Sequence, residues 1–303
     1  MTGLVRSEVL RLRSRRIVWT LALLLVAGIA LATVLIAANS HTTTPAELAS
    51  GKAAYEQALH RCESSGAFRP ANGQPLSEFC PAEIHLADFL PSGTFGLVLL
   101  PDVFQHTAFI LIVIGLVIGA SSIGADWQSG TMGTLLTWEP RRTRLFAVRF
   151  VVVCAGVFVL TLGLDAILAA MLAAVSATRG TTAWLDADWA KSSIAAAMRI
   201  GTVASVGAAL GLSVSMIGRA TGAALAGVFV YLAVFENLIR GLRPGTGPWL
   251  LGPNMIVFVI GRATNVGTEQ TLSLAHAVLV IALYVTIAFA LALAWFRARD
   301  VGS

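Results

Sequence analysis

Six long apolar runs divide the chain into membrane-crossing and polar segments. They cover residues 17–38, 105–124, 147–177, 192–217, 221–240 and 272–296. Each is close to or above the roughly 20 residues with which a helix crosses a bilayer. The runs are continuously apolar rather than alternating, which argues against a β-barrel. The pattern predicts an all-α polytopic membrane protein with six transmembrane helices in a single transmembrane domain, 1–303.

A shorter apolar stretch, residues 249–260, precedes the last run and is too short to cross a bilayer. Gly252 and Pro253 interrupt it. We expect a re-entrant or interfacial segment on the outer face. An ordinary loop with a surface aromatic is the alternative.

Composition agrees with the membrane assignment. Hydrophobic residues make up 56% of the 303 residues and charged residues 12%, whereas soluble domains average about 25% charged. The first apolar run is longer than the apolar core of a signal peptide and lacks its cleavage pattern, so we expect a retained span.

Basic residues set the expected orientation. The net charge of +5 reflects arginines at the ends of apolar runs, which is the positive-inside pattern rather than a nucleic-acid surface. Both termini are predicted to be cytoplasmic, in a bacterial inner membrane. The predicted cytosolic segments contain the following arginines: Arg6, Arg11, Arg13, Arg15, Arg16, Arg141, Arg142, Arg144, Arg149, Arg219, Arg297 and Arg299.

The arm before the first span, GLVRSEVLRLRSRR, places Leu4, Val5, Val9 and Leu12 at helical spacing among arginines. This indicates an amphipathic helix over 1–16 that lies in the inner interface. A basic flank that only fixes orientation is the alternative.

The segment 39–104 is predicted to be extracytoplasmic and contains Cys62 and Cys80. Two cysteines in an oxidising compartment indicate a disulfide, with two free thiols as the alternative. Cys154 lies within the third span, where a packing role is expected.

Catalytic motifs are missing from the sequence. It contains no G-x-x-x-x-G-K-[ST], H-E-x-x-H or G-x-S-x-G pattern and no metal-spaced Cys/His set. We expect no ATP hydrolysis, no metal and no bound cofactor in this chain, and therefore not an enzyme.

Three of the charged residues within the predicted spans lie away from the cytosolic ends: Asp165, Arg199 and Glu236. Charges are expensive in lipid and often mark a transport pathway. Structural pairs are the alternative, Asp165 with Arg199 and Glu236 with Arg240. The fourth and fifth spans are rich in small residues, which predicts close helix contacts.

The segment 125–146 reads DWQSGTMGTLLTWEPRRTR over Asp126–Arg144 and is predicted to be cytosolic. Trp127–Trp138 has no internal proline and could form a helix with an apolar face that needs a covering surface. Pro140 would end it. The membrane surface or a soluble partner could cover that face.

The order acidic-x-x-Ser-Gly-Thr-x-x-x-Leu-Leu-x-x-x-Pro-x-x-Arg in this loop resembles the permease subunits of ABC-2-type transporters. Glu8–Arg16 is similar to that family's elbow helix, and Leu-Gly-Pro-Asn at 251–254 to its outer re-entrant region. Two features depart from the family pattern. Asp126 stands where the family usually has Glu, and the first outer loop is longer than in many drug exporters.

The resemblance implies an exporter subunit that forms the substrate pathway as a dimer, with a second copy or a paralogue. Two separate ATPase subunits would bind ATP and Mg²⁺ and dock on a coupling helix between spans two and three. The residues implied in this coupling are Asp126, Trp127, Gly130, Thr131, Leu135, Leu136, Pro140, Arg141, Arg142 and Arg144.

Two other functions stay open. An ion- or proton-coupled secondary carrier would need Asp165, and a non-transport scaffold or sensor would use segment 39–104. The sequence does not name the substrate, for which apolar spans suit many amphipathic molecules.

Overall fold

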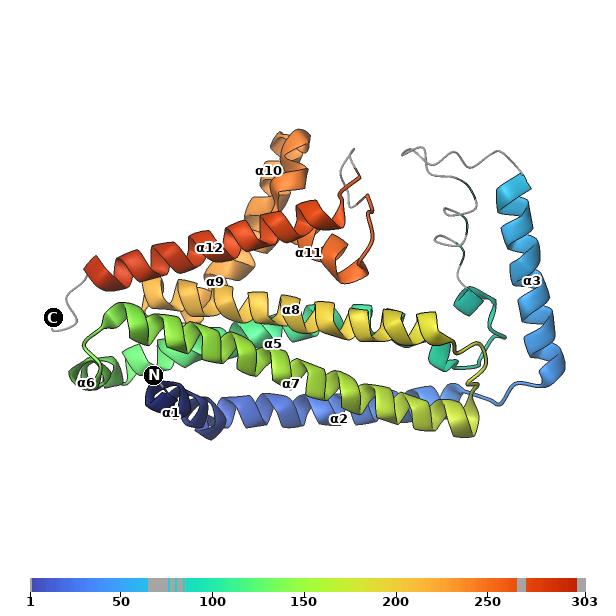
Figure 1. Cartoon of the computed structure of the whole chain (residues 1–303), viewed down its shortest axis with the longest axis horizontal. Helices are drawn as coiled ribbons and strands as arrows, with labels where there is room; N and C mark the ends of the chain where they lie inside the picture. The colour runs from blue at the N-terminus through green and yellow to red at the C-terminus, as the bar shows by residue number, and fades with distance from the viewer. Residues whose placement is uncertain are drawn as a thin grey trace. The chain divides into compact units, whose positions relative to one another are not determined.

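The structure is a computed structural model that describes residues 2–64, 76, 80, 84, 86–265 and 271–298 (Figure 1). Among the described residues, six helices are long and apolar enough to cross a membrane. The predicted all-α multi-pass membrane protein is therefore confirmed. Arg299 and most of residues 65–85 in the predicted outer segment lie outside the described residues.

The helices follow the apolar pattern. The first four spans extend beyond their predicted bounds at both ends, the fifth begins at the predicted Thr221, and the last begins two residues later than predicted, at Leu274. The bounds are α1 (Thr2–Ser14), α2 (Arg16–Asn39), α3 (Pro45–Ser64), η1 (Leu86–Phe89), η2 (Leu97–Leu99), α5 (Leu100–Gln128), α6 (Thr131–Trp138), α7 (Arg142–Arg179), α8 (Ala187–Gly218), α9 (Thr221–Val230), η3 (Tyr231–Phe235), α10 (Glu236–Leu242), η4 (Pro244–Trp249), α11 (Leu251–Ile260) and α12 (Leu274–Ala298).

The chain divides into two compact units. Unit 1 comprises Met1–Leu25, Phe104–Asp165 and Ile194–Ser303, and unit 2 comprises Val26–Val103 and Ala166–Ser193. Unit 1 contains α1, α6, α9 to α12 and most of α5 and α8. The polar residues singled out in the sequence lie in unit 1, apart from the two cysteines.

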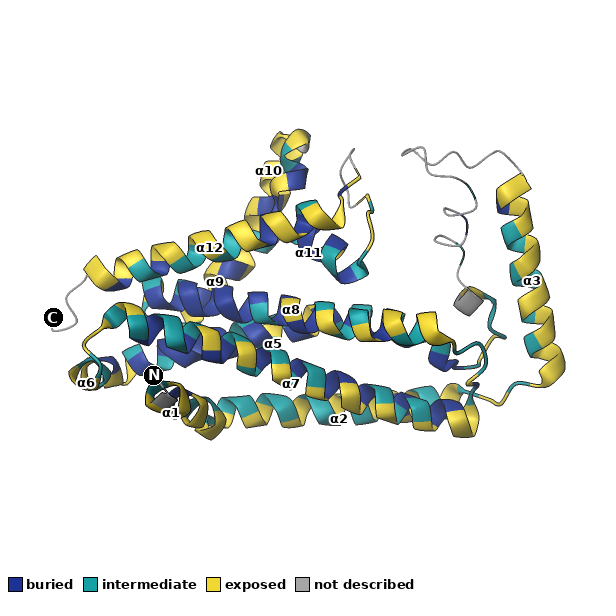
Figure 2. Cartoon of the chain, in the orientation of Figure 1, coloured by how far each residue is buried: buried dark blue, intermediate teal, exposed yellow. Residues whose placement is uncertain are grey.

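The core of unit 1 is the contact between α5 and α8, whose buried residues appear dark blue in Figure 2. A Cβ on Gly115 or Gly119 of α5 would overlap the carbonyl oxygen of Ala204 or Ala208, respectively. Residue numbers rise together along both helices, so α5 and α8 run in the same direction. Small residues thus bring the two backbones together, as predicted for the fourth span.

The glycines of α8 make the reciprocal approach. A Cβ on Gly207 would lie 2.5 Å from the carbonyl oxygen of Ile112, and one on Gly211 would overlap that of Leu116. The contact therefore continues over more than one turn from both helices.

The fifth span is one helix with an irregular middle. A π-helical turn at Tyr231–Phe235 joins α9 to α10. The Tyr231 and Tyr284 hydroxyl oxygens lie 2.7 Å apart, and the Tyr284 hydroxyl donates to the Trp249 carbonyl at 3.2 Å. These bonds tie the π turn to α12 and to the segment before α11.

The short apolar stretch forms the helix α11. Gly252 and Pro253, expected to interrupt this stretch, lie in the first turn of the helix and do not break it. First-turn N–H groups have no partner within their own helix, so a proline there removes no helical bond.

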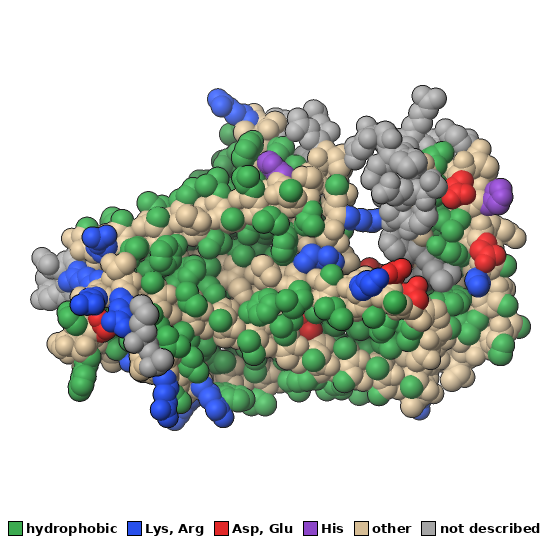
Figure 3. All heavy atoms as spheres, viewed as in Figure 1, with side chains coloured by type: hydrophobic (Ala, Val, Ile, Leu, Met, Phe, Trp, Pro, Cys, Tyr) green, Lys and Arg blue, Asp and Glu red, His purple; other side chains and the backbone are tan. Residues whose placement is uncertain are grey.

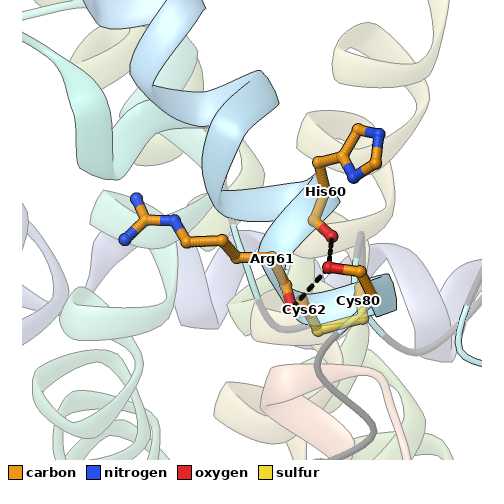
Figure 4. The surroundings of a disulfide bond; sticks show 5 residues. His60, Arg61, Cys62 and Cys80 are labelled. Atoms are coloured by element: carbon orange, nitrogen blue, oxygen red, sulfur yellow. Dashed lines mark hydrogen bonds between the residues drawn. A yellow bond between two sulfur atoms is a disulfide. The ribbon is translucent and has the colours of Figure 1, made fainter.

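In unit 2, α3 begins with a reciprocal capping box. The Thr44 N–H donates to Glu47 at 2.7 Å, and the Glu47 N–H donates to the Thr44 hydroxyl at 3.3 Å. The hydrogen bonds from Thr44 lower the pKa of Glu47. At the other end of α3, Cys62 and Cys80 form a disulfide with a Cα–Cα distance of 6.0 Å (Figure 4).

The disulfide predicts a specific thiol count. Alkylation of the denatured, unreduced protein should modify one cysteine, Cys154, and alkylation after reduction should modify all three. Intact mass spectrometry reads both numbers. Three modified cysteines without reductant would contradict the disulfide. Cys62→Ser should lower the free energy of unfolding of this segment by roughly 3 kcal/mol in the chain-entropy model, because the unfolded segment is no longer closed into a loop.

The α5–α8 contact predicts that Gly119→Ala lowers the free energy of unfolding by about 1–3 kcal/mol, because the added methyl group forces the backbones apart. Thermal unfolding in detergent measures the effect. Gly163→Ala in α7 is the matched control, since a Cβ there meets nothing within 4 Å and alanine favours helix. Equal effects of the two substitutions would contradict the proposed close contact.

Candidate functional site

The segment between α5 and α7 contains a separate short helix. Gly130 has a φ of 71°, and α6 starts at the next residue. The predicted continuous helix Trp127–Trp138 is therefore wrong in one respect: Trp127 belongs to the end of α5, and Thr131–Trp138 forms α6. Glycine adopts the left-handed conformation without a Cβ clash, which allows the chain to change direction here.

One side chain anchors α6 in unit 1. Met132 is 2% exposed and lines a small cavity together with Ile123, Leu145 and Phe146. Leu135 and Leu136 are half-buried, whereas Thr131, Thr134 and Thr137 are exposed. Trp138 is 85% exposed. The helix is thus fixed on one side and leaves an indole uncovered at its end.

Beneath this segment lies a buried network of charges centred on Arg149 of α7. Its guanidinium donates to both carboxylate oxygens of Glu8, at 2.9 and 3.2 Å, and to Oδ2 of Asp126 at 2.7 Å. The side chains of Arg149 and Glu8 are only 3% and 5% exposed. One cation therefore joins α1, α5 and α7.

A second arginine completes the network. Arg15, between α1 and α2, donates to Oδ1 of Asp126 at 2.8 Å and to the carbonyl oxygens of Ser121 and Ser122 at 2.7 and 2.8 Å. Burial lowers the pKa of the Arg15 guanidinium, and the Asp126 carboxylate opposes this shift. Arg11 approaches Asp126 at 3.5 Å from a more exposed position.

The charges in this network nearly balance. Glu8 and Asp126 face Arg15 and Arg149, and Arg11 adds a positive charge at the edge. Such a cluster is stable only when each member has a partner, because an unpaired buried charge is strongly destabilising. Asp126 is directed inward, so contact with any docked partner would fall to the exposed residues of α6.

The other predicted coupling residues surround α6. Trp127 lies under the guanidinium of Arg219, 4.7 Å from the ring centroid. Arg142 donates to the Phe296 carbonyl at 3.1 Å, and Arg144 pairs with Glu139 at 3.7 Å.

Pro140 is exposed, as are several arginines at this end of unit 1, where Figure 3 shows Lys and Arg side chains gathered. The exposed arginines are Arg6, Arg13, Arg16, Arg141 and Arg297.

Asp165, Arg199 and Glu236, the three charged residues singled out within the spans, lie in separate places. Asp165 is 3% exposed and its Oδ2 has no hydrogen-bond partner among the described residues. It forms no ion pair with Arg199. Glu236 instead accepts the backbone N–H groups of Leu251 and Gly252, at 2.8 to 3.1 Å. A carboxylate from α10 thus caps the N-terminus of α11.

No three His, Cys, Asp or Glu side chains in the described ranges come close enough to hold a metal ion. Sequence reasoning missed the joint role of Glu8 and Arg149. Two signals could have indicated it: Glu8 is the one acidic residue in a basic arm, and Arg149 lies just inside an apolar run.

Removing Arg149 should unfold this end of the molecule. We expect Arg149→Ala to lower the free energy of unfolding by about 3–5 kcal/mol, since Glu8 and Asp126 would stay buried without their partner. Thermal unfolding in detergent measures this loss. Lys191→Ala is the control, because it breaks the exposed Lys191–Asp188 pair, and exposed pairs contribute little. A similar effect of both substitutions would contradict the role of the network.

Comparison with known proteins places most of this architecture in one family. No curated protein and no solved structure matches the chain. Residues 85–302, which include α5 to α12 and the whole α6 segment, match the family described as "Protein of unknown function (DUF2705)". Because the match covers more than half of the sequence, the chain belongs to this family.

Proposed function

We propose that the chain is the transmembrane permease subunit of an ATP-driven exporter of the ABC-2 type, working with separate ATP-binding subunits. The observation that carries the proposal is α6, an eight-residue helix fixed by Met132 between two spans, with Trp138 85% exposed at its end. Its position in the chain is that of the coupling helix in the family that the loop sequence resembles.

An exposed tryptophan on a short fixed helix is suited to docking. Tryptophan is enriched among the residues that contribute most to protein interfaces, because a large rigid surface is covered with little loss of conformational freedom. The membrane surface could also accept the indole. A partner ATPase is favoured because α6 is held at its base and leaves an exposed face of small polar residues (Thr134 and Thr137) beside the tryptophan.

In the proposed orientation, the α6 end of unit 1 faces the cytosol. The α6 end of unit 1 carries the exposed arginines, and the positive-inside rule places it in the cytosol. There α1 would lie in the inner interface, with Val9 and Leu10 exposed toward lipid. α11 would then be the outer re-entrant segment, and the membrane would be the bacterial inner membrane.

The buried network suggests how a movement of α6 would be transmitted to the neighbouring helices. Movement of α6 would act on α5 and α7, which Asp126 and Arg149 join, and on α1 through Glu8. Closure of two ATPases on ATP and Mg²⁺ would thus move these helices together as a rigid body. This chain would hold no nucleotide, and a second copy or paralogue would complete the pathway.

One observation favours a second candidate, a proton- or ion-coupled carrier. Asp165 is buried, and one of its carboxylate oxygens has no hydrogen-bond partner among the described residues. Buried carboxylates within spans often carry protons in transporters. Under this alternative, Asp165→Asn would abolish transport while depletion of ATP at a maintained proton gradient would leave it intact.

The coupling proposal is tested at Trp138. The full chain carrying a photo-crosslinking phenylalanine analogue at position 138 should crosslink, in native membranes, to a protein with a G-x-x-x-x-G-K-[ST] motif. Trp138→Ala should reduce recovery of that ATPase with the purified chain by about tenfold or more, the effect of losing an interface hot spot.

Trp249→Ala is the matched control, since Trp249 is also exposed, at 57%, and would lie on the other side of the membrane. It should leave ATPase recovery unchanged. Crosslinks from position 138 to lipid alone, or full recovery with Trp138→Ala, would overturn the docking role of α6.

A further inference from the structure

A groove in unit 1 lies between α5 and α11, with a volume of about 370 Å³. This is within the range of small-molecule sites. Its walls are almost entirely apolar, and Gln105 and His106 are the polar residues that line it. The apolar wall includes Ala108, Phe109 and Ile112 from α5 and Met255, Ile256 and Ile260 from α11.

The groove opens to the surface of unit 1. Phe109 is 74% exposed and Ile256 is 47% exposed, although both line it. Both belong to apolar segments of a membrane protein, so the opening faces hydrocarbon or another apolar surface. A narrow apolar groove open to hydrocarbon can take a single acyl chain.

Arg199 does not line this groove, but helix register places it level with the groove and it lies at the end of α11. Gly115 and Gly119 of α5 pack at Ala204 and Ala208 of α8, and Gly207 of α8 packs at Ile112. Because the helices run in the same direction, Arg199 on α8 lies level with the part of α5 that lines the groove. A Cβ on Gly261 would overlap the Arg199 guanidinium, and Gly261 directly follows the lining residue Ile260.

The guanidinium has unused hydrogen-bonding capacity. Nε of Arg199 is buried, and among the described residues Arg199 has neither a hydrogen-bond partner for Nε nor an ion pair. The C-terminus of α11 provides only the partial negative charge of the helix dipole near the Arg199 guanidinium. A guanidinium carries five N–H donors and binds carboxylate or phosphate in a bidentate manner. An unpaired cation beside an apolar groove complements an anion that bears an apolar chain.

We propose that the α5–α11 groove binds one acyl chain of an anionic lipid, whose head group pairs with Arg199. The inference goes beyond the proposed function, because binding can be measured on the purified chain without an ATPase. Gln105 and His106 would face the polar part of the lipid, next to the apolar wall. A zwitterionic lipid would fill the groove but bring a cation close to Arg199.

The test is native mass spectrometry of the full chain in detergent, titrated with phosphatidylglycerol or phosphatidylcholine of the same acyl composition. We expect one phosphatidylglycerol to bind about tenfold more tightly than phosphatidylcholine, the effect of one charge-assisted pair. Arg199→Gln should remove this preference, and Arg199→Lys should keep part of it. Ile256→Trp, which fills the groove, should weaken the binding of both lipids.

Leu279→Trp is the matched control, because Leu279 of α12 is 56% exposed and does not line the groove. It should leave both affinities unchanged, and thermal unfolding should show that all variants are folded. An undiminished preference in Arg199→Gln would overturn the proposal. So would full competition by glycerol phosphate, which has no acyl chain, or a change of oligomeric mass in Ile256→Trp without a change in lipid binding.

Discussion

The α6 end of unit 1 depends on the buried side chain of Arg149, which must be paired with carboxylates. Arg149 lies within an apolar span, and burying a charged side chain without a partner would cost a large amount of free energy. Glu8 and Asp126 therefore have to reach it, from α1 and from the end of α5. The positions of α1 and of the α5 end follow from this requirement. α6 starts five residues after Asp126, so the same ion pairs hold the end of the helix that precedes it.

The second organising contact is the close approach of α5 and α8. Glycines on both helices meet backbone carbonyl groups, so the backbones touch without intervening side chains. In lipid, such contacts gain van der Waals energy that lipid tails cannot match as closely. They also set the register that brings Arg199 level with the lining of the groove. A structural contact and a candidate binding site thus depend on the same glycines.

The spans could be predicted from the sequence because hydrophobicity is local and their length is set by the bilayer. The disulfide was also predictable, since Cys62 and Cys80 lie close together in one segment. The partners of charged residues were not. A pair with Arg240, one turn away, was the structural alternative for Glu236, but Glu236 caps α11, whose first residues are 15 and 16 positions later. Periodicity carries no information on which distant helix end meets a carboxylate.

The break between α5 and α6 shows the same limit. Gly130 was part of a motif, but the motif did not indicate its left-handed conformation, nor that Met132 and Phe146 would line the same small cavity. The sequence pattern alone did not distinguish one helix from two. The segment Thr131–Trp138 was predicted as helix from its lack of proline, and that part is confirmed.

The π turn at Tyr231–Phe235 affects the direction of the residues that follow it. A π turn accommodates one more residue than an α-helical turn, and one extra residue rotates the following helix by about 100°. Glu236 follows the turn directly, so its direction toward α11 depends on that extra residue. A form of this protein one residue shorter here could be helical throughout, yet it would turn the carboxylate away and leave the first N–H groups of α11 without their acceptor. The length of this span and the cap of α11 are therefore linked through Glu236.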